Sequence, residues 1–326
     1  MQKCDLCDGE SDYYQKTSGR NLCKACFIRY IEKKINDFIS LKRLVSPKDK
    51  ICIGVSGGKD SLVMLLNLHY YASKFPKLPK MEVILVDEGI KRNIEEVKHS
   101  IISSIKKFSL DVNFRIISFK DRVGFRMDEV IKKIESSSVR YNACTVCAAF
   151  RRRILNDMAI ELKCNKLAIG HNLDDTGQTL LQNIIRNDLK RIGKVPPHGL
   201  DVQIAALQDD QQLPFVSRIK PLVNLREKEI IDYCRFKGID FELKDCRYSL
   251  NFPIFRRKIK NFLDKFEENN YEVKYNLLNL NYELYELLRN ERNEESKFNI
   301  CRSCGYPTGE KRSKCMYCFF KEKLAE

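Results

Sequence analysis

Four short apolar runs rich in β-branched residues alternate along the chain with longer segments of helical character. The runs lie at residues 50–56, 81–89, 112–119 and 164–172, and the helices between them are expected at 62–74, 93–108 and 150–162. Strands that alternate with helices predict an α/β fold built on a doubly wound parallel sheet. A further helix is expected at 27–44, a long loop at 196–216 and a charged helical region at 255–298.

The net charge of the chain indicates a candidate class of binding partner. The 326 residues include 59 Lys and Arg against 44 Asp and Glu, a net charge of +15, so a polyanion such as nucleic acid is a plausible ligand. The sequence shows neither a signal peptide nor an apolar run near 18 residues, which predicts a cytoplasmic protein without membrane contact. In that compartment cysteines more often bind metals or act in catalysis than form disulfides.

Cysteine spacing then predicts a metal site at each end of the chain. Eight of the 14 cysteines form four Cys-x-x-Cys pairs at the two chain ends, and two such pairs can enclose one Zn²⁺ in a closed, structural site. The N-terminal set is Cys4, Cys7, Cys23 and Cys26, and the C-terminal set is Cys301, Cys304, Cys315 and Cys318. Two Zn²⁺ ions in two ribbons are therefore expected, and Lys311, Arg312 and Lys314 leave RNA contact by the second ribbon open.

The first apolar run ends in a stretch that favours phosphate binding. A strand that breaks into Ser-Gly-Gly-Lys-Asp-Ser and runs into a helix places backbone N–H groups and a lysine at one helix N-terminus. The Walker spacing is absent, so this is a different kind of loop. The candidate nucleotide-binding residues here are Gly54, Val55, Ser56, Gly57, Gly58, Lys59, Asp60 and Ser61.

Other polar residues follow other predicted strands and should converge on the same nucleotide. Ligands of open α/β sheets bind outside the carboxyl ends of the strands, which adds Asp87, Gly170, His171, Asp174 and Asp175 to the site. Carboxylates suit Mg²⁺, with Asp60, Asp174 and Asp175 as candidates. For Asp174 or Asp175 an N-cap of the following helix is the alternative role. His171 is expected to frame the nucleotide rather than to titrate.

The Ser-Gly-Gly-Lys-Asp-Ser stretch resembles the pyrophosphate loop (PP-loop) of ATP pyrophosphatases, which split ATP between the α and β phosphates. The order of motifs along nearly the whole chain resembles the TtuA/NcsA group of tRNA 2-thiouridine synthetases. These motifs are the loop, VDEGI at 86–90, CTVC at 144–147, GHNLDDTGQTLL at 170–181, IKPLVNLREKEI at 219–230 and DCRYS at 245–249. The resulting domain prediction is a ribbon at 1–28, a catalytic domain at 29–250, a basic tRNA-binding helical region at 251–298 and a ribbon at 299–326.

Cys144 and Cys147 form a Cys-x-x-Cys pair that lacks a second pair for a closed zinc site. The resemblance implies that Cys246 joins them in binding a [4Fe-4S] cluster, that Asp175 is a catalytic aspartate and that Arg151 lies near the transferring group. Persulfide chemistry by the same three cysteines is the alternative. Ala148 and Arg247 depart from the family's usual Gly and Pro. Cys52, Cys164 and Cys234 are expected in the core, with Cys234 a weaker alternative to Cys246.

The resemblance implies an enzyme that adenylates O2 of a tRNA uridine with ATP and then replaces that oxygen by sulfur, releasing AMP and pyrophosphate. It also implies a homodimer and a sulfur donor, either a ubiquitin-like carrier protein or free sulfide. Positions 34 and 54 of the tRNA both stay open as targets. A 2-thiocytidine synthetase and a non-enzymatic zinc-ribbon RNA-binding protein are the alternatives.

Basic clusters on predicted helices or their ends are interpreted as a tRNA backbone surface. They comprise Arg151, Arg152, Arg153, Lys190, Arg191, Arg256, Arg257, Lys258 and Lys260. Aromatic residues near the cysteines, Tyr141, Phe150 and Tyr248, are candidates for stacking on an extruded base, although core packing is the expected role of Phe150.

Overall fold

The computed structural model describes residues 2–75, 77–90, 94–136, 142–193, 196–199, 215–241, 246, 248, 254–290, 299–309 and 312–325. At its centre is a five-stranded sheet in the order β5-β4-β3-β6-β7, and every neighbouring pair is parallel. The strands are β3 (Ile51–Val55), β4 (Met81–Asp87), β5 (Val112–Ser118), β6 (Lys166–Ala168) and β7 (Ser217–Ile219). The predicted doubly wound α/β fold is confirmed, with β7 as a strand that the apolar pattern missed.

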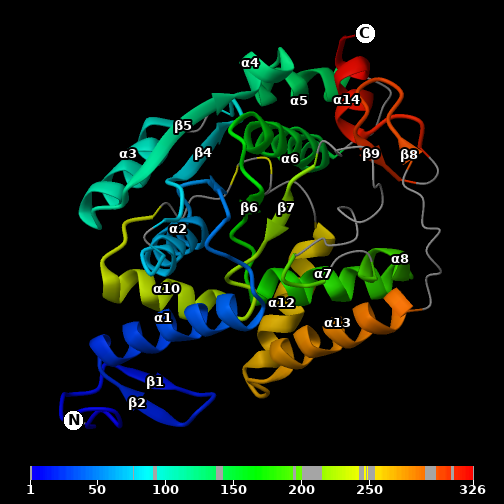
Figure 1. The fold of residues 1–326 in the computed structure, drawn as a ribbon. Helices are drawn as coiled ribbons and strands as arrows, with labels where there is room; N and C mark the ends of the chain where they lie inside the picture. The colour runs from blue at the N-terminus through cyan, green and yellow to red at the C-terminus, as the bar shows by residue number, and fades with distance from the viewer. Residues whose placement is uncertain are drawn as a thin grey trace.

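Strand order reverses direction at β3. From β3 the chain adds β4 and β5 on one side, and then it crosses over to add β6 and β7 on the other side. Helices cover both faces of the sheet (Figure 1): α1 (Lys24–Leu41), α2 (Lys59–Ala72), α3 (Ile94–Lys107) and α10 (Glu227–Lys237) on one, and α4 (Phe119–Val123), α5 (Met127–Ser136) and α6 (Ala143–Glu161) on the other. The carboxyl ends of β3 and β6 therefore flank the crevice where α/β folds bind ligands.

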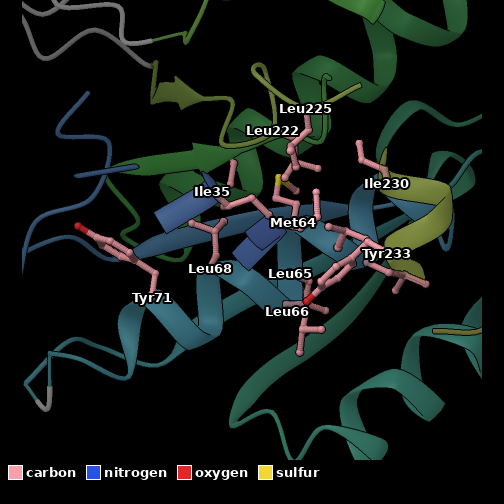
Figure 2. Packing of buried hydrophobic residues seen from close by; sticks show 14 of the residues in the cluster. Ile35, Met64, Leu65, Leu66, Leu68, Tyr71, Leu222, Leu225, Ile230 and Tyr233 are labelled. Atoms are coloured by element: carbon pink, nitrogen blue, oxygen red, sulfur yellow. The ribbon is translucent and has the colours of Figure 1, made fainter. Parts of the chain in front are cut away.

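Side-chain alternation along the strands divides the core between these two faces. In β3, Ile51 and Ile53 pack into one cluster of buried residues, whereas Cys52 between them packs into the other. In the first cluster α1, α2 and α10 pack against one another, with Leu65 of α2 near Tyr233 of α10 and Leu68 of α2 near Ile35 of α1 (Figure 2). Cys164 and Cys234 are buried as well, which confirms the expectation of three core thiols.

The helices between β5 and β6 differ from the sequence prediction in ways that matter for function. Helix α6 begins at Ala143 rather than near 150, because the side chain of Asn142 caps it by accepting a hydrogen bond from the Cys144 amide (2.8 Å). Cys144 and Cys147 thus lie on the first turns of a helix and not in a loop. Helices α4 and α5, between β5 and α6, were not predicted at all.

The charged C-terminal region is helical as predicted. Helices α12 (Ile254–Glu267) and α13 (Val273–Asn290) pack on α7 (Leu173–Ile185), which follows β6, and α8 (Leu189–Ile192) follows α7. Residues 291–298, most of the loop at 196–216, Tyr141, Arg247 and Lys311 lie outside the described residues.

The two cysteine-rich ends lie at opposite sides of the molecule (Figure 1). The N-terminal ribbon contains β1 (Tyr13–Gln15) and β2 (Arg20–Leu22), and the C-terminal one contains β8 (Asn299–Ile300), β9 (Pro307–Thr308) and α14 (Met316–Ala325). The C-terminal ribbon is anchored on α6 by Phe150, which is fully buried and has Tyr317 and Phe320 as ring neighbours at 5.6 and 6.4 Å. Core packing is thus the role of Phe150, as expected.

Candidate functional site

The loop between β3 and α2 has the geometry of an anion cradle. Gly57 has a φ of +72°, in the left-handed region that favours glycine, and a Cβ there would lie 2.7 Å from Cγ1 of Val97. The Ser56 amide donates to the Ser61 hydroxyl oxygen (3.1 Å), and that hydroxyl donates to the Gly58 carbonyl (2.8 Å). These bonds hold the turn so that its remaining N–H groups stand at the N-terminus of α2.

The end of β6 approaches this loop closely. A Cβ on Gly170 would lie 3.2 Å from the Ser61 nitrogen, and the Asn172 side chain donates to the Asp60 carboxylate (2.8 Å). Asn172 also caps α7 in a reciprocal capping box with Asp175. The N-cap role considered for the two aspartates thus belongs to Asn172, with Asp175 at the third helical position of the same box.

A cavity of about 720 Å³ opens at the carboxyl ends of the strands. Most sequence-predicted site residues line it, namely Gly54, Val55, Ser56, Asp60, Ser61, Asp87, Cys144, Arg151, Gly170, His171 and Asp175. The phosphate loop at the end of β3 therefore forms one wall of the cavity, and Cys144 of α6 lies in another wall.

Lys59 and Asp174 do not line this cavity. The Lys59 ammonium is held by Asp60 (3.0 Å) and by Glu227 (2.8 Å), which begins α10. Asp174 is 4% exposed and accepts from Lys274 of α13 and from the Glu227 amide (2.7 Å). Phosphate binding by Lys59 and Mg²⁺ binding by Asp60 and Asp175 stay predictions, whereas the partner of Asp174 is a lysine from the helical region.

The three candidate cluster cysteines interact electrostatically. Burial raises the pKa of Cys144, and the nearby Cys246 raises it further, while Arg151 and Arg256 act in the opposite sense. Burial likewise raises the pKa of Cys147 to about 12, with Cys246 and Cys144 among the groups that contribute. The three thiols do not belong to the groups whose ligand atoms all lie within 4.8 Å of one another in the described residues.

Three sulfurs that do not all lie within 4.8 Å of one another do not share one tetrahedral ion in this arrangement. Each thiolate of a [4Fe-4S] cluster binds a different iron, so its sulfurs stand farther apart than those that share one Zn²⁺. The donor set of three thiols with arginines close by fits such a cluster. Tyr248, the aromatic neighbour of Cys246, donates to Asp128 (2.7 Å).

Charged side chains of the cavity form pairs across the strand ends. Arg151 pairs with Glu88 (3.2 Å), a residue that the sequence analysis did not select, and Arg256 of α12 pairs with Asp175 (2.6 Å). Burial, together with the nearby Lys220 and Arg152, lowers the pKa of His171 to about 3. His171 is thus neutral at physiological pH, consistent with a framing role.

Other cations were missed or assigned differently. Arg218 and Lys220 line the cavity beside β7; Lys220 lies in the IKPL stretch and Arg218 directly precedes it, but the strand there was not recognised from the sequence. Arg153, predicted to contact tRNA, turns instead toward Asp157 (2.8 Å) and the Cys304 sulfur (3.1 Å) of the C-terminal ribbon. Its guanidinium also lies over the rings of Tyr306 and Tyr317.

Both terminal cysteine sets have the geometry of a zinc site. In each set the four sulfurs lie within 4.8 Å of one another; the Cys7 and Cys23 sulfurs are 3.6 Å apart, and the Cys304 and Cys315 sulfurs are 3.7 Å apart. A tetrahedral ion with Zn–S bonds of about 2.3 Å requires sulfur separations of about 3.8 Å. A disulfide requires about 2.0 Å, so these separations fit ion ligands and not disulfides.

Fold and loop together define a class, the PP-loop proteins, and the sequence profile of the PP-loop domain matches residues 28–265. A probable sulfurtransferase of Methanocaldococcus jannaschii is 35% identical, over 98% of this chain and 87% of that protein. The tRNA 2-thiolation protein NcsA of Haloferax volcanii is 31% identical, over 96% of this chain and 97% of that protein.

A solved structure extends the comparison to three dimensions. It is described as the U34-tRNA thiolase NcsA from Methanococcus maripaludis with its [4Fe-4S] cluster, and it has a TM-score of 0.75, 30% identity and coverage of 99% of this chain and 97% of that one. The chain therefore belongs to the PP-loop family and, within it, to the group of sulfurtransferases that includes NcsA. Among the described helices none is long and apolar enough to cross a membrane.

Proposed function

We propose that this protein is a tRNA 2-thiouridine synthetase that acts on the wobble uridine, position 34. The observation that carries the proposal is the shared cavity, in which the phosphate loop, Asp175, Arg151 and Cys144 all face the same space. Position 34 is chosen because the solved relative is described as a U34-tRNA thiolase.

In the first step uridine O2 attacks the α phosphate of ATP, the bond between the α and β phosphates breaks, and pyrophosphate leaves. Ser56, Ser61 and the loop amides bind the departing pyrophosphate, whose charge the N-terminus of α2 stabilises. Asp60 and Asp175 would hold Mg²⁺ on the phosphates, and Asp175 is positioned for this by Asn172 and Arg256.

In the second step sulfide sulfur adds to C2 of the adenylated uridine, and AMP leaves with the former O2 oxygen. Three thiolates on a [4Fe-4S] cluster leave one iron without a protein ligand, and such an iron can carry a sulfide. Cys144, Cys147 and Cys246 would hold this cluster. Arg151 lies seven residues after Cys144 on α6, about two turns along the same face of the helix. There its guanidinium can stabilise the negative charge that develops as AMP leaves.

The sulfur source is proposed to be the thiocarboxylate of a ubiquitin-like carrier or free sulfide, and two Zn²⁺ are proposed in the terminal ribbons. The test compares anaerobically purified wild-type protein with Cys246→Ser and with Cys164→Ser, a core cysteine that serves as control. About four Fe and two Zn per chain are expected in wild type and control, with iron lost only in Cys246→Ser.

Single-turnover assays with a U34 tRNA then follow pyrophosphate release and the transfer of labelled sulfur. Wild-type protein should do both, and Cys246→Ser should retain pyrophosphate release while losing sulfur transfer. Full sulfur transfer by Cys246→Ser would refute the assignment of the three cysteines, and 2-thiocytidine in the product would refute the choice of base.

A further inference from the structure

Six cationic side chains line the cavity, and three of them have carboxylate partners. Arg151 pairs with Glu88 (3.2 Å), Arg191 with Asp188 (2.8 Å) and Arg256 with Asp175 (2.6 Å). The charge of these three arginines is thus balanced within the protein itself.

The other three cations, Arg152, Arg218 and Lys220, make no ion pair within the part of the chain that the structure describes. Burial lowers the pKa of Lys220 to about 8, and Arg218 beside it adds to the fall, while Asp175 opposes it from beyond ion-pair distance. Burial and Arg218 also lower the pKa of Arg152. The three side chains therefore repel one another in a confined space, a cost that a bound anion would remove.

A fourth group at the same place also lacks a partner. His171 follows β6 and lines the cavity, and its Nδ1 is buried without a hydrogen-bond partner in the described residues. After burial, the charges of Lys220 and Arg152 have the largest effects in lowering the pKa of this ring. A buried ring nitrogen beside unpaired cations is an unfilled hydrogen-bonding position, because buried polar groups are nearly always satisfied.

The location of the cluster separates it from the phosphate loop. The loop follows β3, whereas Arg218 and Lys220 belong to the end of β7, two strands away in the order β3-β6-β7. Adjacent strands are about 4.8 Å apart, which places the backbones of the two sites roughly 10 Å from each other. The proposed function assigns the triphosphate of ATP to the loop at the end of β3, so a second anion is needed at the end of β7.

An aromatic side chain beside the cluster indicates what kind of phosphate it would take. Phe215 lines the cavity, and the Arg218 guanidinium lies 5.1 Å from the centre of its ring. The ring of Phe215 also lies 6.0 Å from the ring of Tyr306 in the C-terminal ribbon. A cationic group next to an aromatic face is the usual way in which proteins hold single-stranded RNA, with the phosphate on the cation and a base on the ring.

We propose that Arg152, Arg218 and Lys220 form a subsite for a backbone phosphate of the RNA strand next to the uridine that is modified. This inference rests on the proposed function, since it assumes an RNA substrate in the cavity. In this site Phe215 supports the adjoining base, and the cations fix the register of the strand so that the target base reaches the loop and Cys144.

The test measures the binding of a labelled U34 tRNA transcript and, separately, of ATP to the full-length, metal-loaded protein. The variants are Arg218→Gln/Lys220→Gln, the charge-conserving Arg218→Lys/Lys220→Arg, and the matched control Lys106→Gln/Lys132→Gln on exposed faces of α3 and α5. Binding is followed as a function of salt concentration, because each phosphate contact contributes about 0.7 to 0.9 to the slope of log K against log salt.

We expect Arg218→Gln/Lys220→Gln to bind the tRNA at least about ten-fold more weakly, with the salt slope smaller by about one phosphate contact. ATP affinity should stay within about two-fold. The charge-conserving variant should recover most of the RNA affinity, and the control should keep the wild-type salt slope to within about half a unit. This pattern would support the subsite.

Two results would overturn the inference. Unchanged RNA affinity in Arg218→Gln/Lys220→Gln would show that no phosphate is held there, and a loss of ATP affinity without a loss of RNA affinity would assign the cluster to the nucleotide. Wild-type protein that binds the tRNA through these residues but never thiolates it would instead refute the proposed function and leave the subsite standing.

Discussion

The Lys274→Met variant should be the most informative perturbation of the fold around the site. The Lys274 ammonium is 3% exposed and lies among three carboxylates, with Asp174 of α7 and with Asp264 (2.7 Å) and Glu267 (2.8 Å) of α12 as partners. The ligand atoms of these carboxylates all lie within 4.8 Å of one another. Lys274 therefore reduces the repulsion among these three carboxylates, and it connects α13 to both neighbouring helices.

The loss of unfolding free energy in Lys274→Met depends mainly on the pair with Asp174, which is buried. The pair with Asp264 contributes less, because Asp264 is 44% exposed and is screened by water. Removal of one partner from a buried ion pair costs about 3–5 kcal/mol. With an unfolding entropy of about 2.1 cal/mol/K per residue, the 326-residue chain should lose about 4–7 °C in Tm.

The way in which the stability deficit of Lys274→Met changes with pH tests the same ion pair independently. Burial raises the pKa of Asp174 even beside Lys274, and loss of the ammonium should raise that pKa further. A carboxyl whose folded-state pKa lies above its unfolded value favours folding when protonated, and this stability is lost as pH rises through the folded value. The deficit of Lys274→Met should therefore be smaller at pH 5 than at pH 8.

Thermal unfolding at pH 5 and pH 8, followed by circular dichroism, measures both quantities. Lys33→Met is the matched control, because Lys33 pairs with Asp37 (2.6 Å) while both side chains are more than 60% exposed, and it should change Tm by less than about 1 °C. A Tm of Lys274→Met within about 1 °C of wild type, or a deficit that grows toward pH 5, would refute the reasoning.

Three further predictions concern the phosphate loop, the C-terminal ribbon and His171. Gly57→Ala should weaken ATP binding at least about ten-fold in calorimetry, because the new Cβ would lie 2.7 Å from Val97 on a residue with a φ of +72°. Gly58→Ala should bind ATP nearly as well as wild type, because the nearest atom to its Cβ would be 3.4 Å away. Equal affinities of the two variants would contradict the geometry of the loop. Phe320→Ala should cost about 3–5 kcal/mol in unfolding free energy in denaturant titrations, since Phe320 is 2% exposed against α6, and a loss under about 1 kcal/mol would mean that the ribbon does not depend on this contact. Because burial lowers the pKa of His171 to about 3, the folded protein should lose stability as pH falls below about 6.5. The Tm of His171→Asn should therefore fall less steeply than that of wild type between about pH 6.5 and about pH 4.5. An equally steep fall in the variant would assign the loss of stability to other groups.

The sequence was sufficient to predict those parts of the molecule that local patterns determine. Each of the four apolar runs is a strand, because alternate residues such as Ile51 and Ile53 must be buried on one face and Cys52 on the other. The phosphate loop and the cysteine sets were predictable because their chemistry requires fixed spacings. The start of α6 was not, since its signal is a single Asn142 cap before a segment without clear helical periodicity.

Long-range pairing explains what the sequence could not predict. Asp174 and Asp175 are neighbours on one helix, and only the fold shows that one faces Lys274 and the other the cavity. The partner of Lys59 is Glu227, far along the chain, and no local pattern connects the two. β7 has three residues, too few for alternation to show, so Arg218 and Lys220 could not be placed at a strand end.

The packing of Phe150 against the C-terminal helix affects when helix α6 can complete its folding during synthesis on the ribosome. Helix α6, which carries Cys144 and Cys147, is synthesised long before Tyr317 and Phe320, the residues that cover Phe150. Until Cys304, Tyr317 and Phe320 emerge from the exit tunnel, that face of α6 stays uncovered and the guanidinium of Arg153 lacks the Cys304 sulfur. Synthesis of these three residues therefore completes the support of the cysteine helix, and a chain released before them would have this helix exposed to solvent, chaperones and proteases.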